Sequence, residues 1–219
     1  MVFRSTVADD TKPPRSRLKQ VRLLLWILVA LAIAGTAALL LVRSQSPDVP
    51  QATVTTTQAG LGGPFTLVGG DARPFSSAKL AGKPYAIFFG FTHCPDVCPT
   101  TLARLAQLRQ KLGKGDDAFQ IVFVTVDPER DTPQAVGAYT QLFNTPIIGL
   151  TGSRAQIDQV AKQHAVYQAK VPQADAPDGY TMDHGATVLL FDRDGKFVST
   201  IALEEQDNVA LDKLKRITA

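Results

Sequence analysis

The two cysteines of this chain, Cys94 and Cys98, lie between a strand-type segment and a helix-type segment. Residues 85–89 form a short apolar run that is typical of a central β-strand. After the cysteines, leucines recur at helical spacing until Gly113 ends the pattern, at Leu102, Leu105, Leu108 and Leu112. A turn between such segments predicts both sulfurs in the first helical turn, where unpaired backbone N–H groups favour thiolates. The pair can therefore share a metal ion or form a disulfide.

Strand-type and helix-type segments alternate throughout residues 64–219, which are long enough for one domain with its own core. The expected elements are a hairpin at 64–75, a strand at 121–126, helices at 132–143 and 153–164, a hairpin at 187–201 and a last helix from 207. This order, with the cysteines at the amino end of the first core helix, predicts an α/β domain of thioredoxin-like fold with an N-terminal hairpin.

His184 lies in the segment that enters the second hairpin. In a thioredoxin-like fold this segment lies opposite the cysteine turn, so His184 can face both sulfurs, and the neighbouring Asp183 is expected to orient its imidazole. Of the other two histidines, His93 is interpreted as a turn residue and His164 as a solvent-facing residue at a helix end. The charged cluster at residues 127–131 is expected near the cysteine turn and without a catalytic role. The sequence leaves open whether the cluster is a solvated turn that ends the strand or part of the surface around the cysteine site.

Residues 23–42 form an apolar run without a charged side chain, which is long enough to span a bilayer as one helix. Residues 1–22 are basic, whereas only Arg43 follows closely behind the run, so the amino end is expected in the cytoplasm and the domain outside it. A cleavable signal peptide is the alternative, because Ala30-Leu31-Ala32 resembles a cleavage site, but the run exceeds the usual signal core. Residues 43–63 are rich in small polar residues and predict a flexible linker.

The formal net charge of +3 does not indicate a nucleic-acid partner, because the positive excess lies in the first 22 residues. A mitochondrial address is disfavoured by Asp9 and Asp10, since transit peptides contain few acidic residues. The sequence therefore predicts a single-pass protein of a bacterial cytoplasmic membrane.

Three blocks of the domain strongly resemble the Sco/SenC family. They are residues 90–99 (GFTHCPDVCP), residues 126–133 (VDPERDTP), and Tyr180 with Asp183 and His184. The resemblance implies a membrane-anchored, thioredoxin-like protein that binds one copper ion per domain through Cys94, Cys98 and His184. Gly185 is a departure, because many relatives have a serine after the histidine, but this position is not a ligand.

The resemblance also implies a role in assembling the binuclear copper centre of cytochrome c oxidase subunit II, with copper received from an upstream donor protein. Two thiolates and an imidazole suit Cu(I) in trigonal coordination, and the sequence leaves open whether Cu(II) is also bound. Zinc ranks below copper as the metal, because no general base or substrate pocket is evident.

A thiol-disulfide reductase is the second hypothesis, in which a redox-active Cys94–Cys98 disulfide keeps the recipient cysteines of the oxidase subunit reduced. The spacing of three residues between the cysteines and the lack of a proline at the His184 loop count against a general thioredoxin-type reductase. Peroxide reduction is weaker still, because no threonine lies three positions before Cys94.

Overall fold

The structure, a computed structural model, describes residues 15–44, 60–176 and 178–219. They belong to two compact units, Met1–Thr55 and Thr56–Ala219. The first 14 residues of the predicted basic tail and residues 45–59 of the predicted linker lie outside the described residues.

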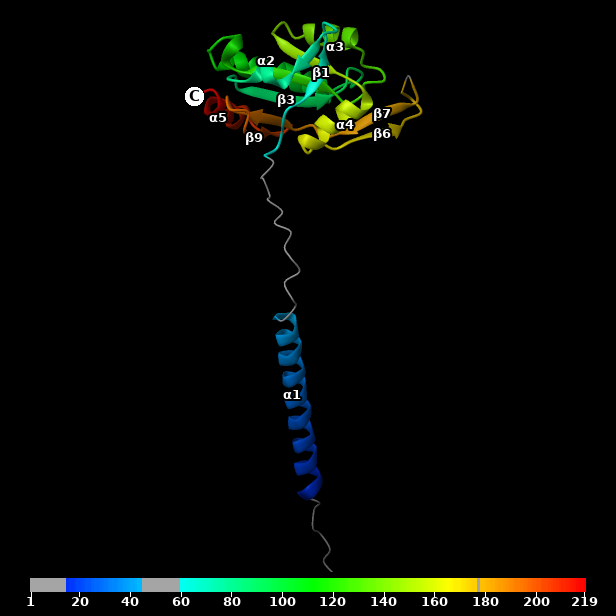
Figure 1. The fold of residues 1–219 in the computed structure, drawn as a ribbon, viewed down its shortest axis with the longest axis vertical. Coiled ribbons are helices and arrows are strands. Elements are labelled where there is room, and N and C mark those ends of the chain that lie inside the picture. The colour runs from blue at the N-terminus through cyan, green and yellow to red at the C-terminus, as the bar shows by residue number, and fades with distance from the viewer. Residues whose placement is uncertain (1–14, 45–59, 177) are drawn as a thin grey trace, which may run out of the picture. The chain divides into compact units, whose positions relative to one another are not determined.

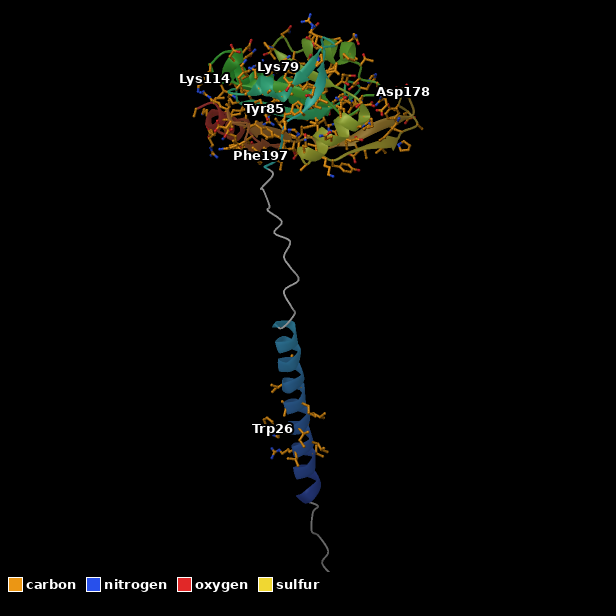
Figure 2. The ribbon with its side chains drawn as sticks, in the orientation of Figure 1. Trp26, Lys79, Tyr85, Lys114, Asp178 and Phe197 are labelled. Carbon is orange, nitrogen blue, oxygen red and sulfur yellow. The ribbon has the colours of Figure 1, made fainter. Side chains whose placement is uncertain are left out.

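The first unit contains helix α1, Arg15–Ser44, which includes the predicted span at residues 23–42 (Figure 1). The side chains of residues 21–33 are exposed, among them Trp26, which Figure 2 labels. Within the described ranges, none of the helices combines the length and the hydropathy that a membrane crossing requires.

The second unit is built on a seven-stranded sheet in the order β2-β1-β5-β4-β3-β8-β9. Its strands are β1 (Thr66–Gly69), β2 (Pro74–Ser76), β3 (Tyr85–Gly90), β4 (Gln120–Thr125), β5 (Ile147–Thr151), β8 (Val188–Phe191) and β9 (Phe197–Ile201). The three central strands β3, β4 and β5 are parallel, and the others pair antiparallel. Strands β6 (Gln168–Pro172) and β7 (Tyr180–His184) form a separate antiparallel pair.

The helices of the second unit are α2 (Val97–Lys111), α3 (Pro133–Gln141), α4 (Arg154–Gln163) and α5 (Asp207–Ile217), with 3-10 turns η1 (Ser77–Leu80) and η2 (Asp116–Ala118). Local signals in the sequence start and end them. Thr132 caps α3 ahead of Pro133, and Ser153 forms a capping box with Gln156 at α4. Gly113 adopts a φ of 67° just beyond α2, a conformation that glycine tolerates best.

The central strands form the core because β3 is apolar throughout and nearly all of β4 is apolar. Phe88 and Phe123 are fully buried neighbours on these two strands, and the three leucines at 102, 105 and 108 bury one face of α2. Helix α2 also meets α5 through ion pairs of Arg104 and Lys111 with Asp207. The predicted α/β domain with its N-terminal hairpin is therefore confirmed, and α2 starts at the carboxyl end of a central strand.

Candidate metal centre

The cysteines lie in and just after the turn that joins β3 to α2. Cys98 is in the first turn of α2 and is fully buried, whereas Cys94 precedes the helix and is half-buried. The expectation of both sulfurs in the first helical turn is therefore wrong for Cys94. Pro95 explains the difference, because a residue before proline disfavours the helical conformation. The Cys98 backbone N–H nevertheless donates to Cys94 Sγ at 3.4 Å, so this sulfur accepts from an N–H at the helix start.

A buried carboxylate fixes the turn that carries Cys94. Asp131 accepts hydrogen bonds from the Thr92 backbone N–H at 2.9 Å, the Thr92 hydroxyl at 2.6 Å and the Thr125 hydroxyl at 2.5 Å. Both Asp131 and Asp127 are fully buried. These two acids are therefore not part of a solvated turn, because the ends of β3 and β4 enclose them and their oxygens find partners inside the fold.

His184 is the last residue of β7 and faces the buried cysteine. Its Nε2 lies 3.6 Å from Cys98 Sγ, and its Nδ1 lies 3.0 Å from the Gly185 carbonyl oxygen. Since a carbonyl can only accept, Nδ1 carries the proton and Nε2 has its lone pair toward the sulfur. The rings of Phe88 and Phe91 pack edge-on against the imidazole at centroid distances of 6.2 and 5.7 Å.

The expected orienting role of Asp183 is wrong. Asp183 is exposed, because alternate residues of a strand point to opposite faces and His184 points inward. In the part of the chain that the structure describes, the Gly185 carbonyl provides the hydrogen bond at Nδ1 instead. A backbone carbonyl leaves no signal in the sequence, so the role could not be found from residue types.

The structure brings Cys94, Cys98 and His184 together, with their three candidate ligand atoms within 4.8 Å of one another. Two sulfurs and one imidazole nitrogen are a donor set that can hold a soft or borderline metal ion. The sequence expectation that His184 can face both cysteines is met, although the two parts of the cluster lie far apart in the chain.

The two thiols have opposite acidities. Hydrogen bonding from the Cys98 side chain and from the Cys98 backbone N–H outweighs burial and lowers the pKa of Cys94 to about 4. Donation of this hydrogen bond, together with burial, raises the pKa of Cys98. At neutral pH the pair therefore holds one proton, with a thiolate at Cys94 and a thiol at Cys98. A Cys94 thiolate is both a nucleophile and a ready metal ligand.

The other two histidines lie outside this cluster. His93 is partly exposed, and its Nδ1 is 3.1 Å from the Thr92 hydroxyl, so it is the turn residue that the sequence predicts. His164 is not solvent-facing, because only 1% of it is exposed and its Nδ1 bonds the Val160 carbonyl at 2.8 Å. Burial lowers the pKa of His164. Its position continues the buried stripe of α4 at Ile157 and Val160, a signal that the sequence did contain.

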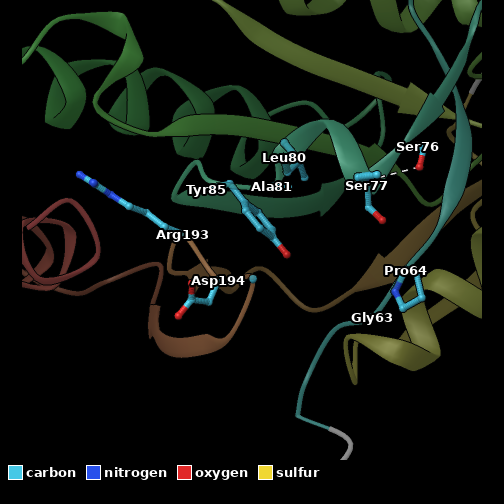
Figure 3. A pocket seen from close by; sticks show the side chains of 11 residues that line it. Gly63, Pro64, Ser76, Ser77, Leu80, Ala81, Tyr85, Arg193 and Asp194 are labelled. Carbon is cyan, nitrogen blue, oxygen red and sulfur yellow. Dashed lines mark hydrogen bonds between the residues drawn. The ribbon is translucent and has the colours of Figure 1, made fainter.

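A cavity of about 500 Å³ lies elsewhere in the second unit (Figure 3). Tyr85 from β3 and Arg193 and Asp194 from the β8–β9 turn are among its lining residues, and the Tyr85 hydroxyl points toward it. None of the three clustered residues lines this cavity. The cavity and the candidate metal centre are therefore separate features of the domain.

Fold and site together define a thioredoxin-like protein in which a cysteine turn faces a histidine from a separate hairpin. A family model described as SCO1/SenC matches residues 53–219. This chain belongs to the SCO1/SenC family.

Relatives of known structure and sequence show the extent of the similarity. A SCO2-like protein of Rickettsia conorii is 34% identical over 192 residues, which cover 86% of this chain and 94% of the relative. A copper-bound structure of Bradyrhizobium japonicum ScoI is 43% identical, with a TM-score of 0.65, covering 72% of this chain and 99% of that chain. A copper-bound structure of Arabidopsis thaliana ScoI is 34% identical, with a TM-score of 0.66, covering 71% and 99%.

Proposed function

We propose that this protein is a copper chaperone that binds one copper ion through Cys94, Cys98 and His184 and serves assembly of the binuclear copper centre in cytochrome c oxidase subunit II. The observation that carries the proposal is the convergence of two sulfurs and one imidazole nitrogen within 4.8 Å. The copper-bound structures of the Bradyrhizobium and Arabidopsis relatives support copper as the metal. The oxidase as recipient, and an upstream copper donor, follow from the family resemblance of the motifs.

The donor set suits a carrier of Cu(I). Two thiolates and one imidazole satisfy a soft ion in trigonal coordination and leave its open side free for a ligand from a recipient. Cys94 supplies a thiolate without a proton to remove, and Nε2 of His184 has a free lone pair. A recipient cysteine or histidine can therefore join the copper before the donor ligands leave, which allows transfer without a free ion.

A thiol-disulfide exchange with the recipient is the second candidate function, and the low pKa of Cys94 favours it. In this reaction the Cys94 thiolate attacks one sulfur of a recipient disulfide and releases the other as a thiolate. Cys98 then loses its proton and displaces the recipient, which leaves a Cys94–Cys98 disulfide and a fully reduced recipient. The same reaction removes both sulfur ligands, so copper binding and thiol oxidation exclude each other.

We further propose that residues 23–42 anchor the protein in a bacterial cytoplasmic membrane with the domain on the outer side. The uncharged apolar run and the basic residues ahead of it support this topology. A reporter that is active only after export, fused to the carboxyl end, should be active, and the protein should stay in the membrane pellet after carbonate extraction. A soluble product that begins after residue 32 would instead indicate a cleaved signal peptide.

Deletion of the gene followed by complementation under copper limitation tests the function and separates the two candidates. We expect the deletion to lower copper oxidase activity, and added copper to rescue it in part. His184→Ala keeps both thiols but lacks the nitrogen ligand, so it should fail like the deletion at low copper. If His184→Ala supports full oxidase assembly and Cys94→Ser or Cys98→Ser does not, the thiol reductase is the function and the copper site is dispensable.

A further inference from the structure

The histidine of the metal centre is carried by a hairpin that is separate from the main sheet. In the described part of the chain, β6 and β7 pair only with each other. Figure 1 shows this hairpin at one side of the second unit, and Figure 2 marks Asp178 at its outer end. No ladder of hydrogen bonds joins β7 to β3 or β4, so the position of His184 against the cysteines depends on the short link from His184 to β8 and on side-chain contacts of the hairpin.

Tyr180, the first residue of β7, makes such a contact. Its hydroxyl donates to Asp127 Oδ1 at 3.1 Å, and both residues are buried. Arg130 donates to the same carboxylate through Nε, and its Nη1 lies 3.4 Å from the Tyr180 carbonyl oxygen. Burial and the Asp127 carboxylate raise the pKa of Tyr180 to about 12, so the hydroxyl keeps its proton and donates at any physiological pH.

The Tyr180 ring is also held by two cations. The Arg130 guanidinium carbon is 3.9 Å from the ring centroid, and Lys170 Nζ of β6 is 3.6 Å from it. Both cations are therefore within cation–π range of the same ring. Contacts of this kind fix the plane of the ring as well as its hydroxyl.

The loop that holds Tyr180 also holds the cysteine turn. We define the post-β4 loop as residues 126–132. Asp127 and Arg130 of this loop contact the hairpin, and Asp131 accepts the hydrogen bonds of Thr92. The loop therefore bridges the two parts of the metal centre, which are distant in sequence. His184 is in β7, whereas the cysteines lie in the turn after β3 and in the first turn of α2.

We propose that Tyr180, held by Asp127 and Arg130 of the post-β4 loop, is a positioning residue that keeps His184 at bonding distance from the cysteines. The effect of Tyr180 on copper binding rests on the proposed copper function, whereas its effect on the position of His184 does not. Tyr180, Met182 and His184 alternate along one face of β7, and the first two are buried. A fixed Tyr180 therefore sets the register in which His184 faces Cys98.

Hydrogen exchange on the metal-free full chain tests the geometry without copper. Tyr180→Phe keeps the ring and removes only the hydroxyl, and we expect amide exchange in β6 and β7 to rise about tenfold or more, with β3 and β4 unchanged. Tyr85→Phe is the matched control, because Tyr85 stacks on Phe191 at the end of β3 remote from the cysteine turn. It should leave exchange in β6 and β7 at the wild-type rate.

Copper binding to the same variants tests the consequence. With Cu(I) as the probe, Tyr180→Phe should lower affinity about 10–100-fold, as loss of a residue that supports a ligand does. X-ray absorption should show weakened nitrogen coordination with both sulfurs retained, which a general loss of stability would not produce. If wild-type chain binds no copper, the proposed function fails, while the exchange data still decide the positioning role.

Arg130→Lys covers the case in which Tyr180→Phe does not fold. Lysine keeps the charge but lacks the planar donor group, so exchange in β6 and β7 should rise, by less than in Tyr180→Phe. Two results would overturn the proposal. The first is amide exchange at the wild-type rate in β6 and β7 of Arg130→Lys. The second is a folded Tyr180→Phe that keeps both the wild-type exchange rate in β6 and β7 and the wild-type nitrogen coordination of copper.

Discussion

At the scale of single residues, the chemistry of the centre depends on an unequal pair of thiols. Cys98 is buried and keeps its proton, and the hydrogen bond that it donates helps to make Cys94 a thiolate. His184 completes the cluster with a neutral imidazole whose protonated nitrogen is turned away from the sulfurs. A metal ion would thus replace one proton of this pair when it binds both sulfurs.

Alkylation kinetics test the acidity of Cys94. Because the pKa of Cys94 is about 4, the reactive thiolate is fully formed above about pH 5, and its rate with iodoacetamide should stay nearly constant from pH 6 to 8. An ordinary cysteine would react roughly 100-fold faster at pH 8 than at pH 6, given a pKa near 8.5. Mass spectrometry identifies the modified residue.

Cys98→Ala provides the control for this measurement. The variant lacks the hydrogen bond from Cys98, so the pKa of Cys94 should rise and its alkylation rate should climb with pH. If the alkylation rate of Cys94 in the wild-type chain rises with pH as that of a free cysteine does, Cys94 is not a thiolate at neutral pH and the arrangement of one thiolate and one thiol is contradicted.

Residue types predicted the three clustered residues but not the residues that support them. Cys94, Cys98 and His184 stand in recognisable motifs, and chain order alone placed the histidine segment opposite the cysteines. Asp127 and Asp131 look like acids of a solvated turn, and only the fold shows that they are buried with hydroxyl and backbone partners. The position of His164 at a helix end suggests solvent exposure, but the aromatic rings of Phe65, Phe89 and Phe191 pack around it.

At the scale of elements, the β3–α2 unit sets the depth of Cys98. The helix starts so close to the strand that a Cβ on Gly90 would lie 2.8 Å from Cys98 Sγ and 3.0 Å from the Phe123 ring. Glycine at this position therefore allows the sulfur to sit directly against the end of β3. The second hairpin and the post-β4 loop then bring His184 to the same place.

Gly90→Ala tests this close packing. The added methyl group must push Cys98 or the two neighbouring phenylalanines aside, which should cost about 1–3 kcal/mol in the free energy of unfolding and weaken copper binding. Denaturant unfolding and a Cu(I) competition assay measure the two effects.

Gly185→Ala is the matched substitution next to His184. A Cβ on Gly185 meets nothing within 4 Å, so stability and copper affinity should stay close to wild type. If Gly90→Ala and Gly185→Ala change stability and copper affinity equally, the close packing of Cys98 against Gly90 does not contribute to either property.

Periodicity predicted the regular elements well where side-chain patterns are strong. The apolar runs of β3 and β4, the leucines of α2 and the caps of α3 and α4 all appear as expected. Strand β5 is not predicted from the sequence, because Pro146 precedes it and Gly149 interrupts its short apolar run. The β6–β7 pair is not among the expected elements, although polar and apolar residues alternate over residues 168–171 and 180–183. Each alternating stretch has only four residues, which is the shortest length at which such a pattern indicates a strand.

At the scale of the whole molecule, the chain divides into a unit that carries α1 and a domain that carries the metal centre. The domain contains the seven-stranded sheet, and the family match extends over it to the end of the chain. The metal centre is the part of the domain on which the proposed function depends most.

X-ray absorption of the full chain loaded with one equivalent of Cu(I) tests this centre most directly. We predict two sulfur ligands and one nitrogen ligand in the wild-type chain, loss of the nitrogen in His184→Ala, and retention of all three ligands in His93→Ala. Identical sulfur and nitrogen coordination in the wild type and in His184→Ala would contradict the account, because the cluster of Cys94, Cys98 and His184 would then not be the copper site.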